Sequence, residues 1–176
     1  MHSEDKGRRS TLASDHAHAR VNIRVTLWRR LVLDLRLRGR GRSESGAFLL
    51  TPRSGIGNRV TSFVCYDDLD PDAYEGGAIA FHAVGHAALW ELCQKKGLRV
   101  LADVHTHPGS YVLQSSIDQR NPMIPLQGHI ALILPNFANT PWWTLDLAGI
   151  YEYLGNFAWR SYTRADGERP VRLTLW

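Results

Sequence analysis

The sequence predicts an α+β domain, in which helices pack on the faces of a central β-sheet. Short apolar runs that indicate strands and amphipathic segments that indicate helices follow one another along the chain. No repeat or low-complexity segment interrupts them. With 176 residues and 44% hydrophobic side chains, the chain is large enough for one domain with a hydrophobic core.

The beginning of the chain differs from the rest in composition. Residues 1–20 are polar and carry His2, His16 and His18. We expect them to form a flexible tail with solvated histidines, before a single domain of residues 21–176. The tail lacks the apolar core of a secretory signal, and no run approaches the ~20 apolar residues of a membrane span.

The cysteines and the charges narrow the class of protein. Cys65 and Cys93 form no CxxC pair, which excludes a cysteine-rich zinc site and leaves them as small buried apolar residues in a cytoplasmic protein. The net charge is +4 with scattered basic residues. The densest basic run consists of Arg36, Arg38, Arg40 and Arg42. We interpret it first as a solvated face and only second as a docking patch.

The first expected elements are a strand and a helix. Residues 20–25 alternate and predict a short strand. Residues 27–38 are ambiguous, because their leucines fit both a period of two and the period of a helix. Thr26 as N-cap and Gly39 as C-terminal stop favour the helix.

A strand, a turn and a returning strand are expected next. Residues 46–51 predict a buried strand, 51–55 a turn, 59–66 its antiparallel partner, and 67–77 an acidic loop. A helix follows over 78–96 and ends at Gly97. Its apolar stripe consists of Phe81, Val84, Ala88 and Leu92. The remaining expected elements are strands over 98–104, 128–134, 145–154, 159–163 and 171–175, and a short helix over 116–121.

Two histidines directly after the strand over 98–104 give the strongest functional signal. His105 and His107 are two residues apart, and residues i and i+2 of a strand point to the same face. Both imidazoles can therefore be directed at one point, and Asp118 can add a carboxylate oxygen from across a loop. Three protein ligands suit a catalytic zinc, which keeps a fourth position open, whereas a structural zinc usually has four.

A second histidine pair competes with the first. His82 and His86 have the i, i+4 spacing of a helical zinc pair. The glutamate that a zincin carries after the first histidine is missing. We therefore expect both on the polar edge of an amphipathic helix.

Hydrolysis at a zinc site also needs a general base that is not a ligand. Glu44 stands just before the strand over 46–51, although composition alone favours a surface carboxylate there. Spacing does not exclude Glu75 or Glu91. Ser115 fits either the N-cap of the next segment or a hydroxyl donor to the oxyanion of a tetrahedral intermediate.

These residues follow a pattern that is found in a known family. His105-Thr-His107, residues 108–114 and then Ser115-x-x-Asp118 resemble the JAMM motif of the MPN+ (JAB) metalloproteases. The segment that begins Glu44-Ser-Gly-Ala-Phe-Leu-Leu resembles the upstream E-x-G-x-x-L-L segment of that family.

The resemblance spans residues 27–154 and implies a fold and a set of roles. The implied fold is cytidine-deaminase-like, α+β, with a central mixed β-sheet flanked by helices. The implied roles are one catalytic Zn²⁺ held by the two histidines and the aspartate, with a general acid/base and an oxyanion donor beside it. In this chain the positions are His105, His107 and Asp118 for the metal, Glu44 for the acid/base and Ser115 for the oxyanion.

The resemblance also implies a substrate class. Most family members cleave isopeptide or peptide bonds after the C-terminal glycine of a ubiquitin-like protein. ESGAFLL and residues 127–135 are similar to bacterial JAB proteins, which are encoded beside E1, E2 and ubiquitin-like genes, some in antiviral defence operons. Expected partners are a ubiquitin-like protein, its conjugates and operon E1 and E2 proteins, but neither nucleic acid nor membrane. A hydrolase of a sulfur-carrier adduct or small-molecule amide, and a non-catalytic MPN scaffold, stay open as alternatives.

Overall fold

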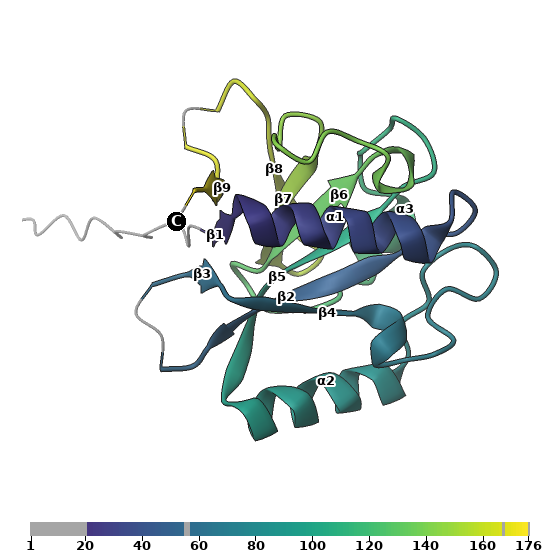
Figure 1. The fold of residues 1–176 in the computed structure, drawn as a ribbon, viewed down its shortest axis with the longest axis vertical. Coiled ribbons are helices and arrows are strands. Elements are labelled where there is room, and N and C mark those ends of the chain that lie inside the picture. Colours follow the sequence, from purple (N-terminus) through teal and green to yellow (C-terminus); the bar gives the residue numbers. More distant parts are fainter. Residues whose placement is uncertain (1–20, 55–56, 167, 176) are drawn as a thin grey trace, which may run out of the picture.

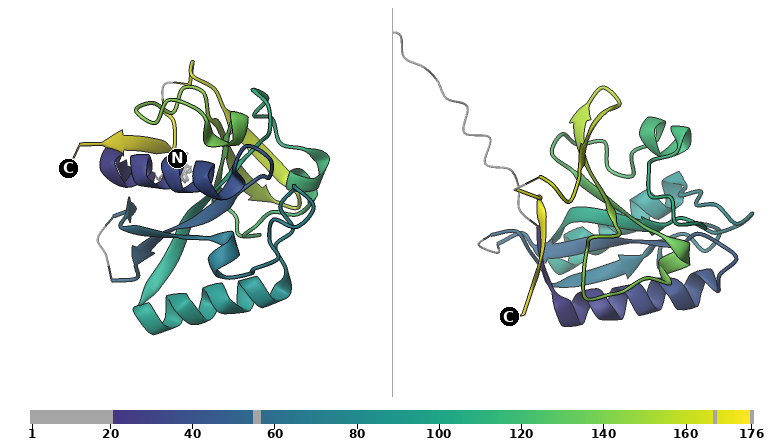
Figure 2. Two further views of the ribbon diagram at one scale, coloured as in Figure 1. Left: turned by 45° about the vertical axis from the view of Figure 1, so that its right-hand side comes forward. Right: turned by 90° about the horizontal axis from the view of Figure 1, so that it is seen from above.

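The computed structural model describes residues 21–54, 57–166 and 168–175, and the tail predicted over 1–20 lies outside them. A mixed six-stranded β-sheet forms the centre, and a smaller three-stranded sheet lies beside it (Figure 1). Helix α1 (Val25–Gly39) packs on one face of the large sheet, and helix α2 (Ala83–Lys96) packs on the other (Figure 2). The predicted α+β class with a central mixed sheet and flanking helices is confirmed.

The large sheet is antiparallel except at its centre. In spatial order its strands are β4 (Ser62–Cys65), β2 (Gly46–Pro52), β5 (Leu98–Thr106), β6 (Ile130–Leu134), β7 (Gly149–Gly155) and β8 (Ala158–Tyr162). β5 and β6 run parallel, and the other neighbours are antiparallel. β5 and β6 are central strands, and their carboxyl ends lie side by side at one end of the sheet, where a loop follows β5.

The small sheet joins segments that lie far apart in the sequence. Its central strand β1 (Val21–Arg24) pairs in parallel with β3 (Arg59–Val60) and with β9 (Val171–Thr174). The strand predicted over 59–66 is therefore only partly right, because its first residues pair with β1 and only β4 returns along β2. In Figure 2 the yellow β9 lies beside the beginning of α1.

Alternation along the strands divides the core between the two faces. Ala102 and Val104 of β5 join Trp28 and Leu35 of α1 in one buried cluster. Phe48 of β2 and side chains of α2 form the other. A strand buried on both faces appears as a continuous apolar run, as β2 does, whereas Asp103 and His105 interrupt the run of β5.

The helix interpretation of residues 27–38 is right, but its predicted ends are wrong. The N-cap is Arg24, in extended conformation at the end of β1, so Thr26 lies inside the first turn. Gly39 is the last helical residue, and Arg40 takes the left-handed conformation with φ 50°. Because β1 ends at Arg24 and the helix follows directly, α1 begins at Val25, one residue before Thr26.

The predicted apolar stripe of the second helix is largely wrong. α2 begins at Ala83, so Phe81 precedes it, and Val84 is 63% exposed. The buried positions are instead Gly85, Leu89 and Cys93. A Cβ atom at Gly85 would lie 2.6 Å from the Phe81 ring, so only glycine allows the two segments to pack this closely.

Several smaller predictions are also resolved. Gly97 ends α2 in the left-handed conformation, as predicted. The strands predicted over 128–134 and 145–154 begin later, at Ile130 and Gly149. Both cysteines are buried and free. Among the described residues, no helix is long and apolar enough to span a membrane.

Candidate metal centre

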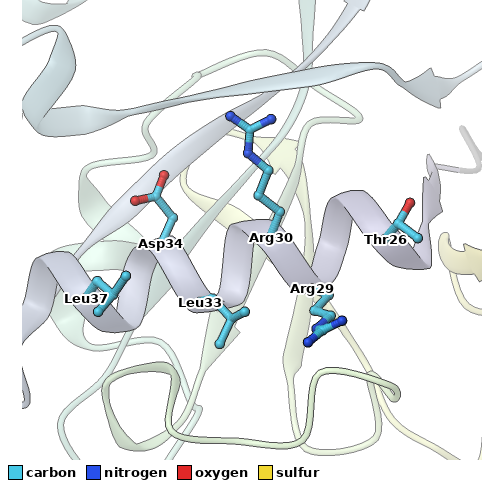
Figure 3. A pocket seen from close by; sticks show the side chains of 6 residues that line it. All are labelled: Thr26, Arg29, Arg30, Leu33, Asp34 and Leu37. Carbon is cyan, nitrogen blue, oxygen red and sulfur yellow. The ribbon is translucent and has the colours of Figure 1, made fainter.

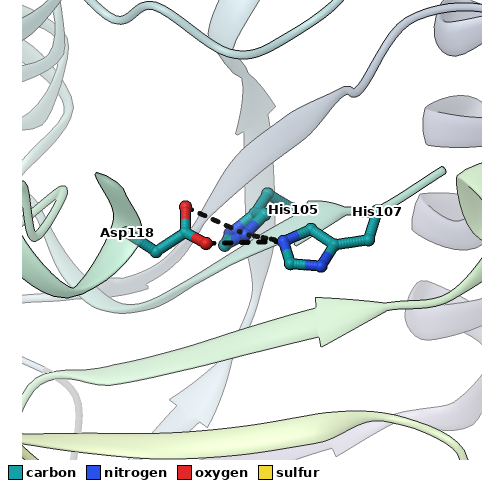
Figure 4. Close-up of side chains that lie close together, drawn as sticks. All are labelled: His105, His107 and Asp118. Atoms are coloured by element: carbon teal, nitrogen blue, oxygen red, sulfur yellow. Dashed lines mark hydrogen bonds and ion pairs between the residues drawn. The ribbon is translucent and has the colours of Figure 1, made fainter. Parts of the chain in front are cut away.

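β5 delivers the two histidines to the face of the sheet that α2 covers. His105 is the penultimate residue of the strand, and His107 follows its end. Val104 and Thr106 point to the opposite face, toward α1. The side chain of His105 is 8% exposed and that of His107 is 11% exposed. The predicted common direction of the two imidazoles is confirmed (Figure 4).

Asp118 is held by a short helix, α3 (Ser116–Arg120), whose N-cap is Ser115. The Ser115 hydroxyl oxygen accepts from the backbone nitrogen of Asp118 at 3.1 Å, and the Asp118 carboxylate accepts from the backbone nitrogen of Ser115 at 2.7 Å. This reciprocal capping box fixes the carboxylate against the first turn. The N-cap role predicted for Ser115 is confirmed.

The three side chains bring their donor atoms to one point. Nε2 of His105 lies 3.3 Å from Nε2 of His107 and 3.7 Å from Oδ1 of Asp118. Nε2 of His107 lies 3.5 Å from Oδ2 of Asp118. Tetrahedral zinc with bonds of about 2.0–2.2 Å sets neighbouring ligand atoms roughly 3.3–3.6 Å apart. The donor types fit a metal ion, and the two nitrogen–oxygen distances, which run to different oxygens of the Asp118 carboxylate, are close to this spacing. Among the described residues, this is the group that could hold an ion.

The histidines and the aspartate of this group shift one another's pKa. Burial alone would raise the pKa of Asp118, but His107, His105 and the capping contacts of Ser115 lower the pKa to about 2. Contact with Asp118 raises the pKa of His107 against the effect of burial. Nδ1 of His107 lies 3.1 Å from the carbonyl oxygen of Tyr111. Because a carbonyl only accepts, that nitrogen carries a proton, and in the neutral imidazole Nε2 then presents its lone pair to the group.

Glu44 lies in the same cavity as His105 and Asp118. It is half-buried just before β2, and its backbone nitrogen donates to the carbonyl of Gly77 at 2.8 Å. Burial raises the pKa of Glu44, while the two histidines oppose the shift. A carboxyl group whose pKa is raised toward neutrality suits proton transfer. Glu75 and Glu91 do not line this cavity, and Glu91 pairs with Lys95 on the outer side of α2.

We call His105, His107 and Asp118 the metal-binding group, because they could hold an ion. The cavity extends from this group across the sheet. It has a volume of about 770 Å³ and is lined by residues 78–81, the beginning of α2, α3, residues 121–123 and Trp159. The Trp159 indole nitrogen donates to the carbonyl of Gln119 at 3.1 Å, which ties α3 to β8. His86 lies 3.0 Å from the carbonyl of Met123 and ties α2 to the opposite wall.

The second histidine pair makes contacts apart from the group of His105, His107 and Asp118. His82 is the N-cap residue of α2 and lies 2.8 Å from Asp70 through Nδ1, at the polar edge of the helix as predicted. His86 differs from the prediction because it is half-buried and lines the cavity.

The basic run lies on the last turns of α1 and the segment after it, and the outer face of the helix carries a separate hollow. Figure 3 shows Arg29, Arg30 and Leu33 projecting from this face. Arg36, Arg40 and Arg42 are exposed, which agrees with a solvated face. Arg38 differs, because it pairs with Asp34, Asp67 and Asp68.

Sequence reasoning missed the residues that lie beneath His105. They are Asp103, Tyr66 and His129, all of them buried. The signal for Asp103 was present, because an aspartate two residues before His105 interrupts an apolar strand and faces the same way. Tyr66 and His129 gave no such signal, since only the fold brings them to β5.

Comparisons with known proteins agree with the fold. No model of a protein family matches the chain. Protein DSY2949 from Desulfitobacterium hafniense is similar, with a TM-score of 0.59 and 15% identity over 88% of this chain and 92% of that chain. A similarity at this identity shows a shared fold and nothing of function.

Two further solved structures are similar at lower scores. AF2198, a JAB1/MPN domain protein from Archaeoglobus fulgidus, has a TM-score of 0.44 and 14% identity over 78% of this chain and 92% of that chain. A protein from Salinibacter ruber has a TM-score of 0.45 and 19% identity over 79% and 90%.

Proposed function

We propose that this chain is a zinc-dependent isopeptidase or peptidase of the JAMM type. Its substrate would be a ubiquitin-like protein, cleaved after the C-terminal glycine. The observation that carries the proposal is the meeting of His105, His107 and Asp118 at one point, with Glu44 in the same cavity. The JAMM-like spacing of these residues in the sequence supports it independently of the geometry.

His105, His107 and Asp118 would hold the ion. When bound, zinc supplies a Lewis acid that polarises a carbonyl group and lowers the pKa of water to roughly 7. The capping box and the proton on Nδ1 of His107 orient two of these ligands before any metal arrives. Such preorganisation favours binding, because less conformational freedom is lost.

Glu44 would act as the general base and then as the general acid. It takes a proton from the attacking water and passes it to the departing amine. Burial raises the pKa of Glu44 above the usual value for a carboxyl group, which favours its role as a proton acceptor and then a donor.

Ser115 can serve the cap and the reaction together. Its oxygen uses a lone pair to accept from Asp118, so the hydroxyl proton stays available. The side chain is exposed at the wall of the cavity. It would donate to the oxyanion of the tetrahedral intermediate, a contribution of about 10²–10³ in rate for such donors.

The substrate tail is expected to lie extended near a strand edge, where its backbone can form hydrogen bonds. Glycines at the end of such a tail would allow a close approach to the cavity. The similarity of ESGAFLL to bacterial JAB proteins supports a role in a bacterial ubiquitin-like conjugation system of antiviral defence.

Two measurements test the proposal. Elemental analysis of the purified protein should give one zinc ion per chain. A ubiquitin-like protein encoded beside this gene, fused to a C-terminal extension, should be cut after its terminal glycine as read by mass spectrometry. Stoichiometric zinc without cleavage of any such fusion would argue for another amide substrate. Absence of zinc binding would refute the catalytic reading.

A further inference from the structure

A cluster of buried polar side chains lies beneath His105, on a face of the sheet that is otherwise apolar. Asp103 is 2% exposed and shares with His105 the face of β5 that points toward α2. One carboxylate oxygen lies 2.7 Å from Nε2 of His129, and the other lies 3.1 Å from the hydroxyl of Tyr66. A carboxylate only accepts hydrogen bonds, so both neighbours donate and hold Asp103 from two sides.

The imidazole of His105 has an unmet donor that this cluster can satisfy. Its Nε2 atom faces the metal-binding group. A neutral imidazole that offers the lone pair of Nε2 carries its proton on Nδ1. That Nδ1 atom is buried and has no hydrogen-bond partner among the described residues, while Oδ2 of Asp103 lies 4.0 Å away. A buried donor without an acceptor is unfavourable, which favours closure of this gap.

We propose that Asp103, anchored by Tyr66 and His129, is a positioning residue for the metal ligand His105. It accepts a hydrogen bond from Nδ1 and so fixes the tautomer and the ring orientation that direct Nε2 at the metal. This inference rests on the proposed metal site. It adds a part of the site that lies outside the JAMM-like spacing, which contains neither Asp103 nor its two anchors.

The anchoring of Asp103 by Tyr66 depends on the close packing of the Tyr66 ring against Gly46. The Tyr66 ring passes over Gly46, where a Cβ atom would lie 2.2 Å from ring carbon Cε2. Phe48 and Phe81 pack against the same ring at centroid distances of 4.7 and 5.2 Å. The hydroxyl of Tyr66 therefore has little freedom, and the carboxylate it contacts is held rigidly.

The experiment compares zinc affinity in four forms of the full-length chain. These are the wild type, Asp103→Asn, Tyr66→Phe and, as a matched control, Glu152→Gln. Glu152 also accepts from a tyrosine hydroxyl, that of Tyr162, but it lies outside the metal-binding group. Dissociation constants are measured by competition with a chromophoric chelator, and the unfolding temperature of each metal-free form is recorded beside them.

In Asp103→Asn, three donors compete for one amide oxygen, so zinc affinity should fall about 10- to 100-fold, the usual effect of losing such a partner. Tyr66→Phe removes one anchor and should weaken affinity by about 2- to 10-fold. Glu152→Gln should bind zinc like the wild type. The Co²⁺ absorption spectrum should change in the two cluster variants and stay unchanged in the control.

A purely structural cluster would give a different result. It would lower the unfolding temperature of the metal-free variants and leave the zinc affinity of the folded protein at the wild-type value, which overturns the positioning role. If Asp103→Asn does not fold, Tyr66→Phe decides by the same criterion. Wild-type protein without zinc affinity refutes the proposed function as well, whereas tight wild-type binding with unaltered variants refutes this inference alone.

Discussion

The two faces of the six-stranded sheet are built from alternating residues of the same strands, yet their chemistry differs. Toward α1, β5 presents Ala102 and Val104 to a cluster that contains Trp28. Toward α2, the same strand presents Asp103 and His105. One face therefore packs apolar side chains of β5 against the helix, and the other places charged and hydrogen-bonding groups of the same strand in its interior.

This difference separates stability from chemistry. Burying apolar area stabilises the fold, whereas buried polar groups are unfavourable unless each is paired. A polar site on the α2 face depends on the apolar clusters of both faces for the free energy that holds the strands in register. Period-two alternation lets one strand serve both purposes, because neighbouring residues face opposite ways.

The largest effect should come from Glu44, which lines the cavity on the α2 face. Glu44→Gln keeps the size of the side chain but removes its capacity to accept a proton. We expect kcat/KM for the fusion substrate to fall by about 10²–10⁴, with zinc content and unfolding temperature at the wild-type values. A variant that cleaves at the wild-type rate would assign proton transfer to another group.

A substitution on the α1 face should have the opposite profile. Leu35 is fully buried in α1, and Leu35→Ala should lower the free energy of unfolding by about 2–5 kcal/mol. Activity per folded molecule should stay unchanged. Denaturant unfolding measures the stability. The cleavage rate is divided by the number of zinc-binding molecules, which a titration with zinc counts.

Leu37 provides the control for that experiment. It lies on the same helix but is 73% exposed, so Leu37→Ala should change the free energy of unfolding by no more than about 0.5 kcal/mol. Equal losses in the two variants would mean that burial against the sheet does not account for the effect, since alanine favours the helix at both positions.

A substitution at Gly46 tests how packing on the α2 face affects zinc binding. A methyl group there overlaps the Tyr66 ring, and Gly46→Ala should cost about 1–3 kcal/mol of stability. Because the ring must move, zinc affinity should fall together with stability. Gly39→Ala is the matched control on the α1 face, where the added Cβ would meet Ser45 at an ordinary 3.5 Å, and both quantities should stay near their wild-type values.

The motif in the sequence predicted the metal-binding group well, because its information is local. His105 and His107 need only strand periodicity to share a face, and Ser115 and Asp118 need only the three-residue spacing of a capping box. Glu44 needed more. Its place in the cavity follows from the pairing of β2 with β5, which sets Gly46 opposite His105.

What the sequence could not give are contacts between distant segments. Tyr66 and His129 reach Asp103 only because β4 and β6 lie on either side of the β2–β5 pair. The stripe of α2 was misjudged for a related reason, since its buried face depends on where Phe81 packs. Tertiary packing therefore overrode the periodicity of Phe81, Val84, Ala88 and Leu92.

The smallest expected effect among the buried positions lies at Thr106, which is on the α1 face between the two histidines. Its hydroxyl oxygen accepts from the backbone nitrogen of Ser45 at 2.9 Å, and its own backbone nitrogen donates to the carbonyl of Ser45. Thr106→Val keeps the shape but leaves a buried N–H without an acceptor, so stability should fall by roughly 1–2 kcal/mol. Thr106→Ser, which retains the oxygen, is the control.

The functional consequence of Thr106→Val should be selective. The contact holds the chain that leaves Glu44 but touches no ligand of the metal-binding group, so kcat should fall while the zinc dissociation constant stays at the wild-type value. Kinetics with the fusion substrate and chelator competition measure the two separately. A loss of zinc affinity as large as that of Asp103→Asn would show that Thr106 on the α1 face positions His105, and that the two faces do not divide stability from chemistry.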